Sequence, residues 1–216
     1  MKYKIYMPHF QFPSHYVFWT KVENHEKIKS HYLSKIKSID KNISNKHNFI
    51  CNVRSNIRER VDFFEDDTDS MNSIVWKPIQ EMIEESNNEL LLGESIIQSY
   101  WYNMYETGDF QEKHAHHAYP IEMNGKVFHP SLSIIYILND NNTSGSTMFT
   151  DTHSKPFGPM LSYVSLDTSK IEEIGEGSVI IFSSKLDHMV KPVKIGGRIT
   201  IAFNIFSTFT RTEGKP

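Results

Sequence analysis

Cysteine is almost absent from this sequence, since Cys51 stands alone among 216 residues. A single thiol cannot form an intramolecular disulfide, which excludes the small disulfide-stabilised scaffolds. Long apolar runs are missing as well, and the first ten residues, MKYKIYMPHF, are too polar for a signal peptide or a membrane-spanning helix. We therefore expect a soluble, intracellular protein of the cytoplasm with no membrane partner.

Positive charge is not in excess either, because 23 Lys and Arg residues face 26 Asp and Glu residues, for a formal net charge of −3. A protein that neutralises many phosphates carries a surplus of basic side chains. This composition therefore argues against nucleic acid as the substrate. A content of 38% hydrophobic residues is enough for one well-filled core, and we expect a single domain over residues 1–216.

Residues 1–94 are predicted to form an N-terminal α/β support layer, in which residues 2–7, KYKIYM, alternate as in a strand. A helix is predicted after Asn24, a residue that can cap it. The apolar residues that recur there at helical spacing are Ile28, Tyr32, Ile36 and Ile39. A second helix is predicted over residues 73–85. The acidic run at 60–70 between the two helices is predicted to be a solvated loop.

After Gly93 the sequence becomes a series of short β-rich runs separated by Gly, Asn, Asp, Ser and Pro. This pattern is typical of an all-β sandwich or barrel. Eight strands are predicted, at 95–105, 110–116, 131–138, 145–150, 160–166, 177–182, 188–193 and 198–206. Eight strands make a jelly roll, so we predict a mainly β fold with N-terminal helices, in which residues 95–208 form a double-stranded β-helix core.

The run HAHH at residues 114–117 is the clearest candidate for metal chemistry. Residues two apart on a strand point to the same face, so His114 and His116 can both face the core while His117 must face away. His188 begins a distant strand after the apolar run SVIIF. Together, His114, His116 and His188 would make a three-ligand set that leaves open positions on the metal.

Arg198 begins the apolar strand RITIAFNIF, where a buried charge is expensive unless it meets an anion. A carboxylate bound by both arms of the guanidinium is the usual solution. The alternatives are an ion pair with an internal Asp or Glu, or a position at the opening of an edge strand. The sequence alone leaves these readings open.

The chain from Ser95 to Phe206 resembles the Fe(II)- and 2-oxoglutarate-dependent oxygenases, particularly the prolyl-4-hydroxylase-like branch and related phage-type oxygenases. The resemblance rests on residues 103–116, 131–150 and 177–200, which are similar in order and spacing to the family's metal-binding and cosubstrate-binding strands. It implies a dioxygenase that uses Fe(II), O2 and the cosubstrate 2-oxoglutarate to hydroxylate a C–H bond of a peptide or a small molecule. The phage-type likeness extends the expected location to a virus-infected host cell.

Carried onto this sequence, the resemblance makes His114 and His188 iron ligands. It makes Arg198 the partner of the distal carboxylate of 2-oxoglutarate, with Thr200 hydrogen-bonding beside it. Three further positions match residues that reach the cosubstrate in some members or line the same pocket: Tyr105, Asn103 and Tyr136. The segment at 117–130 resembles an insertion between core strands and is expected to cover the iron as a substrate loop.

His116 departs from the family's pattern, which has Asp or Glu at this position. His116 can itself ligate, giving a neutral three-histidine site, or it can turn aside and leave two histidines and a water. In the third alternative the carboxylate of Asp151 completes the set. We favour ligation by His116, because strand alternation already points it inward.

Two other classes of function compete with the oxygenase. A cupin would use three histidines and no 2-oxoglutarate, since GDFQEKHAH also fits the first cupin motif, but the second motif is missing and Arg198 would have no role. A non-catalytic jelly-roll binding or structural protein would explain the missing carboxylate. Among oxygenase substrates, the closest branch favours a peptidyl residue such as proline.

Overall fold

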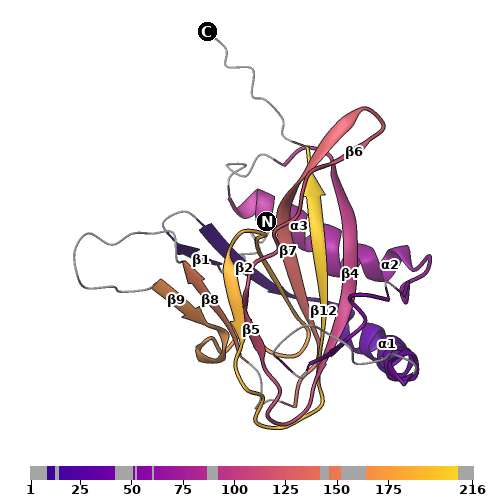
Figure 1. Ribbon diagram of the computed structural model, residues 1–216, viewed down its shortest axis with the longest axis vertical. Coiled ribbons are helices and arrows are strands. Elements are labelled where there is room, and N and C mark those ends of the chain that lie inside the picture. The colour runs from indigo at the N-terminus through magenta and orange to yellow at the C-terminus, as the bar shows by residue number, and fades with distance from the viewer. Residues whose placement is uncertain are drawn as a thin grey trace, which may run out of the picture.

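Two facing antiparallel β-sheets form the core, and helices from the N-terminal region cover one of them (Figure 1). The computed structural model describes residues 9–12, 15–41, 51, 53–59, 61–86, 92–141, 146–151 and 164–208. The predicted mainly β jelly-roll fold with N-terminal helices is confirmed, while the strand predicted at 2–7 lies outside the described residues. None of the described helices is long and apolar enough to cross a membrane.

The large sheet has the strand order β1-β2-β10-β7-β12-β4-β3, and β6 pairs with β7 off this path. Its strands are β1 (His9–Phe12), β2 (His15–Lys21), β3 (Arg54–Ser55), β4 (Ser95–Tyr105), β6 (Ile121–Met123), β7 (Lys126–Asn139), β10 (Ser178–Ser183) and β12 (Arg198–Ser207). Both faces of this sheet are buried. Along β12, Ile199 and Ile201 pack in the cluster that contains the helices, whereas Thr200 and Ala202 face the small sheet.

The small sheet has the strand order β5-β11-β8-β9. Its strands are β5 (Gln111–His114), β11 (Asp187–Val190), β8 (Thr147–Asp151) and β9 (Val164–Asp167), and the short helix η2 (Thr168–Lys170) follows β9. His188 pairs with His114 and Val190 with Gln111, so two steps along β11 match three along β5. This irregularity is a β-bulge, and it turns both Gln111 and His114 toward the large sheet.

The helices bury the apolar stripes that the sequence predicts. Helix α1 (His25–Asp40) buries Ile28, Tyr32 and Ile36. The second helix starts earlier than expected, because α2 (Thr68–Met71), the π-helical turn η1 (Asn72–Trp76) and α3 (Lys77–Glu85) follow one another without a break. Its N-cap is Asp67, whose side chain accepts a hydrogen bond from the Ser70 amide at 3.0 Å and another from the Tyr32 hydroxyl at 2.6 Å.

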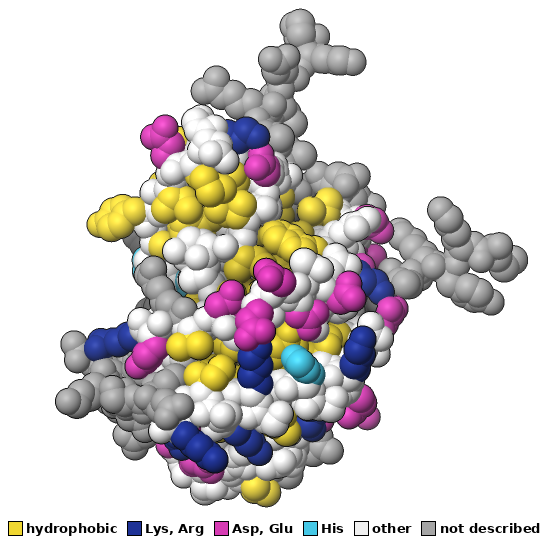
Figure 2. Space-filling view, turned by 90° about the vertical axis from the view of Figure 1, so that its right-hand side faces the viewer, with side chains coloured by type: hydrophobic (Ala, Val, Ile, Leu, Met, Phe, Trp, Pro, Cys, Tyr) yellow, Lys and Arg dark blue, Asp and Glu magenta, His cyan; other side chains and the backbone are white. Residues whose placement is uncertain are grey.

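The acidic run at 60–70 is a solvated loop only in part, because residues 61–67 are outside any helix and Asp62, Glu65 and Asp66 are exposed, but two aromatic residues within it are buried. Phe63 and Phe64 are 0% and 1% exposed and pack against Tyr32 and Tyr100. Burying a phenylalanine side chain contributes about 1.5–3 kcal/mol. These two aromatic residues therefore anchor the segment to the core, and the acidic side chains around them lie at the surface. Figure 2 shows a band of acidic side chains across the middle of this side of the molecule.

The segment at 117–130 contains a β-hairpin rather than an irregular loop. Strand β6 pairs with the start of β7, and the turn is made by Asn124 and Gly125, which both have positive φ, 53° and 72°. A two-residue Asn-Gly turn with this geometry is typical of tight hairpins. The hairpin projects from one end of the large sheet (Figure 1), its exposed hydrophobic side chains are Met123 and Val127, and the exposed Tyr119 lies two residues before β6.

Candidate metal centre

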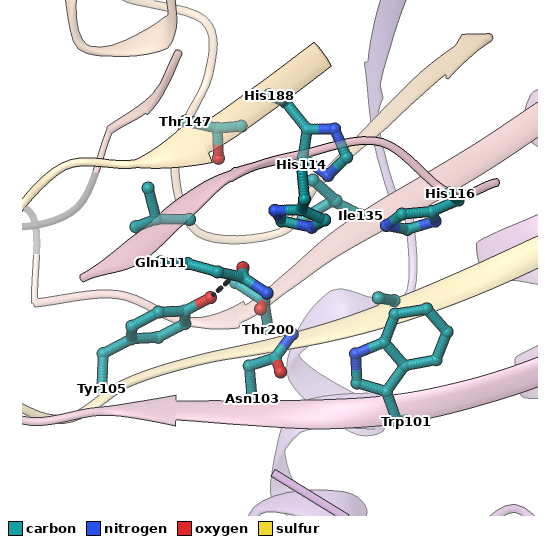
Figure 3. A pocket seen from close by; sticks show the side chains of 12 residues that line it. Trp101, Asn103, Tyr105, Gln111, His114, His116, Ile135, Thr147, His188 and Thr200 are labelled. Atoms are coloured by element: carbon teal, nitrogen blue, oxygen red, sulfur yellow. Dashed lines mark hydrogen bonds between the residues drawn. The ribbon is translucent and has the colours of Figure 1, made fainter. Parts of the chain in front are cut away.

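Three histidines converge between the two sheets (Figure 3). His114 is the last residue of β5 and His188 lies in β11, whereas His116 lies two residues beyond β5 and outside any strand. Their ligand atoms all lie within 4.8 Å of one another. The expectation that His116 belongs to the strand is wrong, but its backbone amide donates to the Ser184 carbonyl at 2.9 Å and its ring still lies beside the other two.

Backbone carbonyls fix the tautomer of two of these histidines. The Nδ1 atom of His114 lies 2.7 Å from the Glu112 carbonyl oxygen, and that of His188 lies 3.0 Å from the Leu186 carbonyl oxygen. A carbonyl only accepts, so each Nδ1 must carry the hydrogen. Each Nε2 is then left with its lone pair, which is the form that a metal ion requires.

The surroundings of His116 and His188 favour their neutral forms. Burial, followed by the neighbouring His114 ring, lowers the pKa of His116 to about 4. The same two causes lower the pKa of His188 well below its ordinary value of 6.5. Neutral imidazoles in a buried cluster are ready to bind a cation without first losing protons.

These pKa shifts predict an acid-sensitive fold for the metal-free protein. The folded-state pKa values lie below the unfolded value, so the unfolded chain binds protons more tightly and stability falls as pH drops from 6.5 toward 4. We expect a loss of about 1.4 kcal/mol per pH unit for each histidine. Urea unfolding between pH 6.5 and 5 measures the slope. His116→Gln should make it shallower, and a flat wild-type profile would contradict the prediction.

Arg198 is 1% exposed and lies at the start of β12, directly opposite Tyr105 of β4. Its Nη1 atom donates to Asp140 Oδ2 at 2.7 Å, so the alternative of an internal ion pair holds for one arm of the guanidinium. The Nε and Nη2 atoms are buried and have no partner in the described part of the chain. Nε and Nη2 form the edge that binds a carboxylate through two parallel hydrogen bonds. The structure therefore leaves one carboxylate-binding edge of Arg198 open.

The pocket below the histidines brings together most of the predicted cosubstrate residues. Its lining consists of Trp101, Asn103, Tyr105, Gln111, His114, His116, Ile135, Thr147, His188, Val190, Thr200 and Ala202. Asn103 and Thr200 are cross-strand partners in β4 and β12. Burial raises the pKa of Tyr105, so its hydroxyl stays protonated and donates to Gln111 Oε1 at 3.1 Å (Figure 3).

Three predicted residues do not line this pocket. Arg198 lines a separate cavity together with Asp140, although its cross-strand partner Tyr105 lines this one. The Tyr136 hydroxyl lies 2.8 Å from His25 Nδ1, and its ring packs in the cluster with the helices, because the neighbouring Ile135 takes the pocket face of β7. Asp151 ends β8, where its backbone pairs with Val164. The side chain of Asp151 lies outside the described residues, so its role as an alternative ligand stays a prediction.

Sequence reasoning missed several residues of the site. Gln111 faces the pocket only because of the bulge in β5, and Thr147 faces it from β8 with a buried hydroxyl that has no partner among the described residues. Asn204 and Ser133 contact the Nδ1 atom of His116 at 2.7 and 2.8 Å. The only sign of these residues in the sequence is Asn204 itself, a polar residue inside the apolar strand RITIAFNIF.

Neither a protein-family model nor a curated protein sequence matches the chain. Solved structures do match. The non-heme alpha ketoglutarate dependent epimerase SnoN from nogalamycin biosynthesis has a TM-score of 0.59 at 9% identity, with 89% of this chain and 76% of that chain covered. A prolyl hydroxylase from Trichoplax adhaerens, in complex with a hypoxia inducible factor peptide fragment, has a TM-score of 0.56 at 14% identity, covering 88% and 83%.

HygX from Streptomyces hygroscopicus, with nickel and 2-oxoglutarate bound, has a TM-score of 0.52 at 10% identity, covering 89% of this chain and 83% of that chain. The chain has the fold of the 2-oxoglutarate- and iron-dependent oxygenases. Within this oxygenase fold, the histidine cluster of the small sheet faces β4 and β12 of the large sheet (Figure 3). Such a fold hosts different reactions, so the chemistry has to be argued from the residues of the site.

Proposed function

We propose that the chain is an Fe(II)- and 2-oxoglutarate-dependent dioxygenase that hydroxylates a C–H bond. The observation that carries the proposal is the open Nε and Nη2 edge of Arg198, a buried cationic group without a full set of partners in the described chain. Such an edge is costly unless a carboxylate occupies it. Arg198 is the cross-strand partner of Tyr105 and lies two residues before Thr200, and both of these residues line the pocket below the three histidines. One small dianion and one metal ion would therefore satisfy both groups.

When bound, iron would activate dioxygen, which is the oxidant: one oxygen atom would enter the C–H bond to give an alcohol, and the other would enter succinate as 2-oxoglutarate loses carbon dioxide. The chain supplies the rest. The Nε2 atoms of His114, His116 and His188 would hold the metal, while Arg198 and Thr200 would hold the distal carboxylate. The remaining pocket walls exclude water and orient the cosubstrate: Trp101, Asn103, Tyr105 and Gln111.

A three-histidine site changes the electrostatics of this design. Where the family has a carboxylate ligand, a neutral imidazole leaves one more positive charge at the metal. This charge favours an anionic cosubstrate and alters the metal preference of the site. Arg198 already pairs with Asp140, so the additional charge at the metal would strengthen the attraction for 2-oxoglutarate.

Thr147 gives a test of the cosubstrate pocket. Its hydroxyl is buried, lines the pocket and has no partner among the described residues, so it is available to a bound oxygen atom. Thr147→Val is expected to weaken 2-oxoglutarate binding about tenfold, the effect of one hydrogen bond of roughly 1.4 kcal/mol. Calorimetry with Mn(II) in place of iron measures the change.

Thr150→Val is the matched control, because Thr150 lies in the same strand β8 and its hydroxyl is also buried without a described partner, but it does not line the pocket. The control should leave 2-oxoglutarate binding unchanged. Equal dissociation constants for the two variants would remove Thr147 from the proposed site.

The activity itself is tested by oxygen-dependent formation of succinate from 2-oxoglutarate in the iron-reconstituted protein. The rival functions give different results. A cupin would bind metal but show no saturable binding of 2-oxoglutarate with Mn(II). A non-catalytic jelly-roll protein would give no succinate, and either result would overturn the proposal.

Peptidyl proline is the first substrate class to test, because one structure of this fold is a prolyl hydroxylase in complex with a peptide fragment. The β6–β7 hairpin within residues 117–130 is the segment we propose to contact the substrate. Tyr119, which lies two residues before β6, is 91% exposed. An increase in succinate formation on addition of proline-containing peptides would support this substrate class, and no response to such peptides would argue for small molecules.

A further inference from the structure

A row of polar side chains crosses the inner face of the large sheet beside the histidine cluster. Asn204 of β12 is the direct cross-strand partner of Ser99 in β4 and of Ser133 in β7. Ser133 is fully buried. On each of these three strands, the neighbouring residue that faces the pocket is apolar: Trp101 on β4, Ala202 on β12 and Ile135 on β7. Ser99 and Asn204 are partly buried. Buried polar groups require partners, so the hydrogen bonds of this row can be followed one by one.

The hydrogen bonds run in one direction along this row. The Ser99 hydroxyl donates to Gln98 Oε1 at 2.6 Å, so it accepts from Asn204 Nδ2 at 3.0 Å. The amide oxygen of Asn204 is thereby turned to the other side, where it lies 2.7 Å from His116 Nδ1. An amide oxygen only accepts, which places the hydrogen of His116 on Nδ1. The lone pair of this ring is then on Nε2, as in His114 and His188.

His116 needs this help more than the other two histidines. His114 and His188 lie in paired strands and are oriented by backbone carbonyls, which any sequence provides. His116 lies beyond the end of β5, and side chains orient its ring. A carboxylate at this position could ligate through either oxygen, but an imidazole ligates only if the correct nitrogen faces the metal.

We propose that Asn204 is the positioning residue that makes His116 the third metal ligand, in place of a carboxylate. This inference rests on the proposed function, because it takes the three histidines as the metal site. Ser133 lies 2.8 Å from the same Nδ1 atom and is a secondary partner. Groups that hold the second nitrogen of a ligating histidine typically contribute 10–100-fold to metal affinity.

Metal binding to the full chain tests the proposal, with Mn(II) and Co(II) as probes and a fluorescent chelator as competitor. Asn204→Leu keeps the volume but removes the acceptor, and is expected to weaken metal binding 10–100-fold. Asn204→Asp restores an acceptor and should bind within a few-fold of the wild type. Ser133→Ala should have a smaller effect than Asn204→Leu, because Asn204 still accepts from Nδ1.

Asn139→Leu is the matched control. Asn139 is a partly buried asparagine at the end of β7 whose Nδ2 donates to the Gly197 carbonyl at 2.6 Å, and it does not line the metal pocket. It should lower stability without changing metal affinity. The visible spectrum of the Co(II) form gives a second readout, since loss of one nitrogen ligand changes its bands in Asn204→Leu but not in the control.

The outcomes separate this inference from the proposed function. If wild type and Asn204→Leu bind metal equally and give the same Co(II) spectrum, Asn204 has only a structural role, and the dioxygenase proposal stands. If Asn204→Asp is as weak as Asn204→Leu, the acceptor argument is overturned. If the wild-type chain binds no metal, both proposals are overturned.

Discussion

Replacing Arg198 with methionine is expected to weaken 2-oxoglutarate binding about 100-fold or more while metal binding stays unchanged. The Nε and Nη2 edge is buried and open, and two charge-assisted hydrogen bonds to a carboxylate contribute about 1.5–3 kcal/mol each. Each 1.4 kcal/mol is a factor of about ten in the dissociation constant. Calorimetry on the Mn(II)-loaded protein measures both the metal and the cosubstrate affinity.

The choice of variants for this experiment has to account for Asp140, which forms an ion pair with the Arg198 guanidinium and has a side chain that is only 10% exposed. Removing Arg198 alone breaks a largely buried ion pair, at a cost of roughly 3–5 kcal/mol in folding stability. The better comparison is therefore Arg198→Met combined with Asp140→Asn, measured against Asp140→Asn alone. Equal affinities of these two proteins for 2-oxoglutarate would show that Arg198 does not bind the carboxylate.

The sequence predicts the sheet core well because its long strands are buried and carry strong patterns. Strand β4 spans Ser95–Tyr105 as predicted, and β12 exceeds its predicted range by one residue. Arg198 could also be identified in advance, since a charge at the start of an apolar strand demands a partner. The Asn124–Gly125 turn of the hairpin carried an equally clear signal, because an Asn-Gly pair between alternating residues is typical of a two-residue turn.

The face of each strand was harder to predict. Both faces of the large sheet are buried, one against the helices and one against the small sheet, so hydrophobic alternation cannot say which face holds the pocket. The family resemblance assigns Tyr136 to the pocket, but Ile135 lines it instead. Only a polar or charged residue, such as Arg198 or Thr200 on β12, can indicate which of the two buried faces holds the pocket.

Local irregularities account for the remaining differences. Strict alternation cannot place both Gln111 and His114 on one face, and only the bulge against β11 does so. The role of Asn204 depends on residues 88 and 105 positions away, His116 and Ser99. Contacts of this range follow from strand order and register, which the spacing of residues along the chain does not specify.

His188→Ala is expected to abolish stoichiometric iron binding and, with it, turnover. The His188 ring is 2% exposed, and its centroid lies 4.3 Å from that of His114 and 5.0 Å from that of His116, so it is the central member of the cluster. We expect a loss of at least about 100-fold in metal affinity, because mutating only the hydrogen-bond partners of a ligand already costs about 10–100-fold. His117→Ala is the matched control, because His117 is exposed and adjacent to His116.

His116→Ala completes the series and decides between the three-histidine site and two histidines with a water. Ligation by His116 predicts that iron affinity falls by more than about tenfold, since a neutral nitrogen ligand is removed from a buried site.

His116→Asp should keep iron and restore an anionic ligand, and the lower charge at the metal should weaken 2-oxoglutarate binding. Metal analysis after anaerobic reconstitution measures the first effect and calorimetry the second. Stoichiometric iron with unchanged affinity in His116→Ala would leave His114 and His188 as the only histidine ligands.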